Sequence, residues 1–139
     1  MKQNEPVDPI KSPIYNLHQE SQEWLSELAF WRDEVAFFYH LFQSHAEEFS
    51  TDKPTAKETE TKKQLLHFSS NTIDQLKMEV DAHEQFLAKL MRQASAEDHL
   101  YRMRHEVLEK KFKETENAFR VLKQAIFKMV AKHTKDFVK

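Results

Sequence analysis

Apolar residues recur every three or four positions over most of the chain, which is the spacing of one face of an α-helix. The first such segment covers residues 17–49, the second covers about 60–94, and the third begins after Ser95 and runs to the end of the chain. No stretch alternates apolar and polar residues in the way that a half-buried strand does. The sequence therefore predicts an all-α protein with three long helices.

Polar segments that contain proline divide this pattern. Three of the four prolines lie in residues 1–16, which lack a sustained apolar period, so we expect an irregular arm there and a single helical domain over residues 17–139. Asn16 is placed to cap the first helix. Short loops make neighbouring helices antiparallel, which predicts an up-down-up bundle. Residues 69–72 are four poor helix formers in a row, and a true turn there would give four helices.

The sequence of 139 residues contains no Gly and no Cys, and each absence excludes a class of site. Without Gly, the phosphate-binding loop, the dinucleotide fingerprint and the nucleophile elbow are missing as written motifs. Without Cys there are no disulfides, thiolate metal ligands or cysteine nucleophiles. We find no catalytic constellation, no signal-peptide core and no apolar run near the length of a transmembrane helix. We therefore expect a cytoplasmic, non-enzymatic protein.

Charge is distributed unevenly along the chain, although the net charge is only −2. Residues 1–60 carry 5 Lys and Arg against 12 Asp and Glu, whereas residues 61–139 carry 16 against 11. The simplest interpretation is that an acidic first helix packs against a basic third helix. A basic stripe near the C-terminus could instead bind phosphates or an acidic surface, and it comprises Lys128, Lys132, Lys135 and Lys139. Because no nucleic-acid-binding module is present, we expect no nucleic-acid partner.

Several histidines and glutamates fall on the predicted inward faces of the helices. With loops centred near residues 55 and 95, Glu27 lies level with His83, and His83 lies nearly level with His105. Residues four apart share a helix face, which brings two more carboxylates close to the histidines. The sequence therefore predicts one polar layer in the middle of the bundle, formed by Glu27, His83 and His105 and flanked by Glu79, Arg104 and Glu109.

Two interpretations of this layer compete. Carboxylates and imidazoles that project inward from helices build metal sites, so iron, zinc or manganese could be held by Glu27, His83, His105, Glu79 and Glu109. However, the Glu-x-x-His motif of ferritin-like sites is absent. Alternatively, Glu27 pairs with Arg104 or a histidine, and the layer fixes the helix register.

Aromatic residues are more numerous than the predicted core requires. Trp24, Trp31 and Phe38 recur every seven residues and are expected in the core. Other aromatics lie off the main stripes and suggest an interface, namely Phe30, Phe37 and Phe86. Because uncovered apolar surface often marks a protein contact, our leading hypothesis is self-association, as in a homodimer, or binding of another protein. The alternative is a metal-binding protein with a redox, storage or sensing role.

Overall fold

The computed structural model describes residues 14–48, 56–93 and 98–138, with side chains for all of them except residues 45–48, 93, 98 and 132–138. Every described residue is helical, and none of them lies in a strand. The predicted all-α class is therefore confirmed. Within these ranges, no helix combines the length and the apolar character needed to cross a membrane.

Three long helices make up the described part of the chain. The first is α1 (Ile14–Glu48), and the last is α4 (Asp98–Val138). The middle helix consists of α2 (Ala56–His67), a π-helix η2 (Phe68–Ile73) and α3 (Asp74–Gln93), which follow one another without a gap.

The start of α1 differs from the expectation. The helix begins at Ile14 rather than at Leu17, so Asn16 lies inside it and does not cap it. The irregular arm predicted for residues 1–16 is therefore wrong for its last three residues, and the rest of that arm lies outside the described residues.

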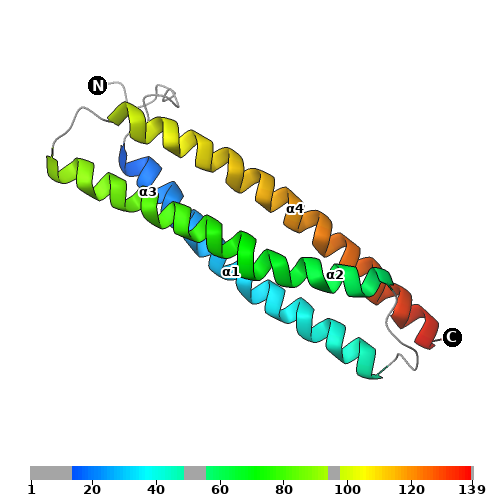
Figure 1. The fold of residues 1–139 in the computed structure, drawn as a ribbon. Coiled ribbons are helices and arrows are strands. Elements are labelled where there is room, and N and C mark those ends of the chain that lie inside the picture. The colour runs from blue at the N-terminus through cyan, green and yellow to red at the C-terminus, as the bar shows by residue number, and fades with distance from the viewer. Residues whose placement is uncertain (1–13, 49–55, 94–97, 139) are drawn as a thin grey trace, which may run out of the picture.

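The three helices lie side by side over much of their length (Figure 1). Ring contacts give their relative directions: α1 meets α4 at Trp24–Phe112 and Phe38–Phe127, and the middle helix meets α4 at His83–His105 and Phe68–Phe119. Between the first two contacts, the residue numbers rise along both α1 and α4. Between the last two, they fall along the middle helix as they rise along α4. Residues far apart in the sequence are thus brought to the same height.

The middle helix contains one residue more than a regular heptad pattern allows. Its buried positions are spaced by three or four residues, except for a step of five from Phe68 to Ile73. That step coincides with η2, and a π-helical turn accommodates one inserted residue while the helix continues. The Ser70 hydroxyl also donates to the Leu66 carbonyl at 2.9 Å. The break predicted for residues 69–72 is therefore a π-helical segment.

Apart from the step at η2, buried side chains follow steps of three, four or seven residues on all three helices, and they form two clusters. The larger cluster surrounds Trp31, which contacts the rings of Phe68, Phe112 and Phe119. The smaller one lies toward the start of α1 and comprises Leu17, Leu87, Leu90 and Tyr101. Trp24, Trp31 and Phe38 are all buried, as expected from their spacing. Two buried histidines lie beside the smaller cluster: His83 stacks on Tyr101, and His105 stacks on Trp24.

Candidate functional site

Two histidines and a glutamate form a hydrogen-bonded chain across all three helices. His83 on α3 is 4% exposed and His105 on α4 is 3% exposed. Nε2 of His83 lies 3.1 Å from Nδ1 of His105, and Nε2 of His105 lies 2.8 Å from Oε1 of Glu20 on α1. Both nitrogens of the His105 ring are therefore engaged, and the chain links the interior to a partly exposed carboxylate.

Aromatic rings fix the orientation of both imidazoles. The indole of Trp24 stacks on His105 with a centroid distance of 4.6 Å. The phenol of Tyr101 lies parallel to the His83 ring, with centroids 4.2 Å apart. Because neither imidazole can rotate without losing a stacking partner and a hydrogen bond, the two rings are held ready in one geometry.

The protonation states follow from burial and from the hydrogen bonds. Burial lowers the pKa of His83 to about 4, and the nearby charges of His105 and Arg104 act in the same direction. His83 is thus neutral near pH 7, with one nitrogen as donor and the other as acceptor. A carboxylate only accepts, so His105 donates from Nε2 to Glu20. Of Nδ1 of His105 and Nε2 of His83, one nitrogen donates the hydrogen bond and the other accepts it.

Two polar atoms next to this chain are buried without a hydrogen-bond partner. One is Nδ1 of His83, and the other is the hydroxyl of Tyr101, which lies near Ser21 but forms no hydrogen bond of normal geometry with it. Burial, followed by the negative charge of Glu84, raises the pKa of Tyr101, so the phenol stays protonated. Unpaired buried polar atoms are costly, and their presence sets this region apart from an ordinary core.

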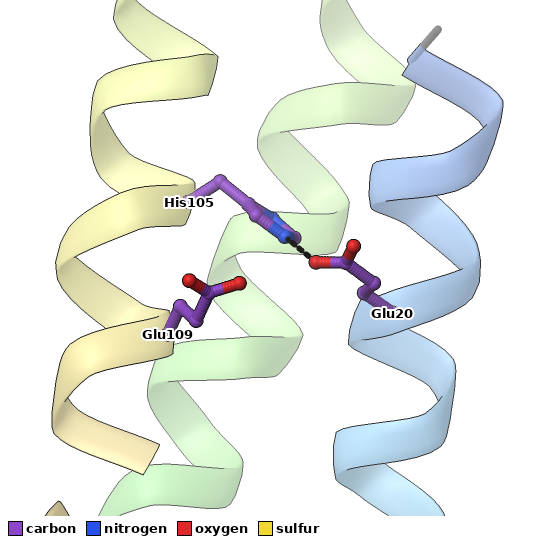
Figure 2. Close-up of side chains that lie close together, drawn as sticks. All are labelled: Glu20, His105 and Glu109. Carbon is purple, nitrogen blue, oxygen red and sulfur yellow. Dashed lines mark hydrogen bonds and ion pairs between the residues drawn. The ribbon is translucent and has the colours of Figure 1, made fainter. Parts of the chain in front are cut away.

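A second carboxylate approaches the exposed end of the chain. Figure 2 shows Glu20 from α1 and Glu109 from α4 on either side of the space below the His105 ring. One ligand atom each from Glu20, His105 and Glu109 can be chosen such that all three lie within 4.8 Å of one another. Imidazole nitrogen and carboxylate oxygen are ligands of divalent transition metals.

The structure rearranges the predicted polar layer. It brings His83 and His105 together and places Glu109 close to His105, but Glu27 is exposed and does not belong to the layer. Partial desolvation, and then the negative charges of Glu116 and Glu23, raise the pKa of Glu27. The prediction that Glu27 faces His83 is therefore wrong, because the register of α1 differs by about two helical turns.

Glu79 and Arg104 also have other partners than expected. Lys111 donates to both carboxylate oxygens of Glu79 at 2.7 and 2.8 Å. The guanidinium of Arg104 lies over the Phe86 ring, 4.3 Å from its centroid. The predicted pairing of Glu27 with Arg104 or a histidine is wrong for the same reason of register.

The structure places the remaining candidates at the surface or outside its described part. Phe30 and Phe37 are exposed on α1, whereas Phe86 is half-buried. Lys128 is exposed on α4, and the side chains of Lys132, Lys135 and Lys139 lie outside the described residues. The basic stripe therefore stays a prediction.

Sequence reasoning missed Glu20, which takes the position expected of Glu27. The two residues are seven apart and occupy the same face of α1, so periodicity alone favours neither. The hydrogen-bonded contact of Glu20 with His105 settles the choice.

His83 also lines an apolar groove between α3 and α4. Its cavity measures about 420 Å³, and its walls are formed by Glu79, Ala82, His83, Leu100, Met103, Arg104, Val107 and Leu108. Most of these side chains are apolar, and several are exposed. His83 thus contacts His105 in the hydrogen-bonded chain and also forms part of the wall of the groove.

No known protein family, no curated protein and no solved structure shows significant similarity to this chain. The residues that bear on function are therefore Glu20, His83, His105 and Glu109 and those that line the groove.

Proposed function

We propose that this is a cytoplasmic, non-enzymatic protein that folds as an up-down-up three-helix bundle and acts by self-association, with the groove between α3 and α4 as its contact surface. The contacts of α1, the middle helix and α4 support the bundle. The proposal about association depends on a different observation, which is the continuous apolar stripe that α4 exposes along the groove.

Three apolar residues of α4 form this stripe. Leu100, Met103 and Val107 are spaced by three and four residues, so they lie on one side of the helix. Their exposed fractions are 40%, 51% and 68%. A single exposed apolar residue is normal, but a contiguous row beside a cavity is typical of a contact surface. Covering the row with a second helix would remove its apolar area from water, which is favourable.

The charges at the walls of the groove favour a second copy of the chain as the partner. Arg104 stands on the α4 wall and Glu79 on the α3 wall. In a two-fold dimer, if one residue of the first copy contacts a second residue of the other copy, the reverse contact also forms. Such an arrangement can place Arg104 of one copy beside Glu79 of the other while the apolar residues pack between them.

Two valine substitutions on the same helix test this proposal. Val107 borders the groove, whereas Val121 lies outside it on α4 and is 64% exposed. Because both side chains are exposed, Val107→Glu and Val121→Glu should both fold. We expect the wild type and Val121→Glu to have twice the mass of one chain in light scattering, and Val107→Glu to be monomeric. A wild-type monomer at all concentrations, or equal behaviour of the two variants, would refute self-association through the groove.

The predicted contact residues Phe30 and Phe37 lie on α1, away from the residues that line the groove. Their exposure is compatible with a further contact surface. The same measurement on Phe37→Glu shows whether that surface contributes: a monomeric Phe37→Glu together with a dimeric Val107→Glu would move the interface to α1.

A further inference from the structure

The arrangement of Glu20, His105 and Glu109 brings two carboxylates close together at one imidazole. Two carboxylates converge on one imidazole, and their oxygens lie within 4.8 Å of each other and of the ring nitrogen. Like charges at this distance repel. Lys113 lies 3.7 Å from Glu109, and both of these side chains are well exposed, so water screens the pair. A cation held between the two carboxylates would relieve the repulsion.

The imidazole in this cluster is oriented in the way that metal-binding histidines are. Such histidines use one ring nitrogen for the metal and the other for a hydrogen bond that fixes the ring. Nε2 of His105 contacts Oε1 of Glu20 at 2.8 Å, while Nδ1 contacts Nε2 of His83 at 3.1 Å. The stacked Trp24 holds the ring plane. The expensive part of a metal site, a buried and correctly oriented imidazole, is therefore already built.

We propose that Glu20, His105 and Glu109 bind a divalent transition-metal ion, such as Zn²⁺ or Mn²⁺. The ion would be bound by Nε2 of His105 and by one oxygen from each carboxylate, with water at the remaining positions. It would replace the proton that His105 now donates to Glu20. Nδ1 of His105 remains in its hydrogen bond with Nε2 of His83 and keeps the ring in place.

The surroundings favour a site with an open position. His105 is buried, but the side chains of Glu20 and Glu109 are 43% and 44% exposed. The ion can therefore enter from solvent, and three protein ligands leave room for water. Because Glu20 is on α1 and the other two ligands are on α4, bound metal would join these helices. This site extends beyond the proposed association, since none of its three ligands lines the groove.

Two glutamates on α4 provide a matched test. Glu109 belongs to the cluster, whereas Glu106 is exposed on the same helix and is not part of it. The full chain, purified without a His tag and stripped with EDTA, is titrated with Zn²⁺ and then with Mn²⁺ by calorimetry. We expect one ion per chain for the wild type and for Glu106→Gln. Glu109→Gln should bind about tenfold more weakly or worse, since it loses a direct ligand.

Circular dichroism shows whether the variants are folded, and Glu109→Gln leaves the Glu20–His105 contact intact. The melting temperature gives a second measurement, because an ion that binds only the folded chain raises it. The increase with Zn²⁺ should be smaller in Glu109→Gln than in Glu106→Gln. The proposal is overturned if neither Zn²⁺ nor Mn²⁺ binds stoichiometrically to the wild type. Equal affinity of Glu106→Gln and Glu109→Gln would overturn it too. A Val107→Glu variant that still binds Zn²⁺ would keep the two proposals separate.

Discussion

The two ends of the helical core are built from different chemistry. Around Trp31, aromatic rings from α1, the middle helix and α4 pack at centroid distances between 4.5 and 6.1 Å, and the closest pair is Phe68 and Phe119. Toward the start of α1, the core contains His83 and His105 instead, together with the unpaired hydroxyl of Tyr101.

This difference separates the part of the protein that provides stability from the part that carries its candidate chemistry. Moving apolar rings out of water is favourable by itself, so the residues around Trp31 need no hydrogen-bond partners. Imidazoles and hydroxyls lose hydration when they are buried and must regain it from hydrogen bonds. Where those bonds are incomplete, as at Nδ1 of His83, the residues cost stability. Their presence makes the polar end the better place to look for function.

The largest expected effect comes from truncating a ring at the aromatic end. Phe119→Ala removes a side chain that is 1% exposed and stacked on Phe68, so we expect a loss of about 3 to 5 kcal/mol in the free energy of unfolding. Phe127→Ala, at an exposed ring of the same helix, should cost clearly less. Urea unfolding at pH 7 gives both values. Equal losses would mean that the aromatic cluster is not the main source of stability.

The next effect depends on pH and belongs to the polar end. Burial lowers the pKa of His83 from its ordinary 6.5 to about 4, so the unfolded chain binds more protons than the folded one between these values. The contribution of this group to the free energy of unfolding is therefore fully present above pH 6.5. It is lost as the pH drops toward 4, by about 3 kcal/mol.

Because carboxylates titrate in the same range, the comparison is with His83→Leu, which lacks the titrating group. Urea unfolding in EDTA at pH 7 and at pH 5 should show a clearly smaller loss for His83→Leu than for the wild type. If both proteins lose the same stability, burial of neutral His83 is not the source of the pH dependence.

The sequence was sufficient for features that depend on periodicity within one helix. The all-α class and the burial of Trp24, Trp31 and Phe38 follow from spacing alone. The meeting of His83 and His105 was also predictable, because only residues 94–97 separate α3 from α4 and little error in register can accumulate.

Features that depend on register across the first loop could not be predicted in the same way. The end of α1 and the start of α2 are separated by residues 49–55, and η2 adds a residue to the middle helix. Glu20 and Glu27 are equivalent by periodicity, so only the packed structure distinguishes them. The residue types at 69–72 indicate a weak helix, but they do not indicate that the helix continues there as a π-helical segment. The groove and the unpaired atoms depend on side-chain packing, which spacing does not encode.

The smallest effect tests whether the polar end carries an uncompensated cost. Tyr101→Phe keeps the ring that stacks on His83 and removes the buried hydroxyl that lacks a hydrogen bond. We expect the free energy of unfolding to rise by about 1 kcal/mol, since an unsatisfied buried group is removed without leaving a cavity. The control is Tyr39→Phe: the hydroxyl of Tyr39 accepts a long, exposed hydrogen bond from Gln43, so its removal should change stability little or lower it slightly. A Tyr101→Phe variant less stable than the wild type would show that this hydroxyl is satisfied in solution, for example by Ser21, and that the contrast between the two ends is smaller than the geometry indicates.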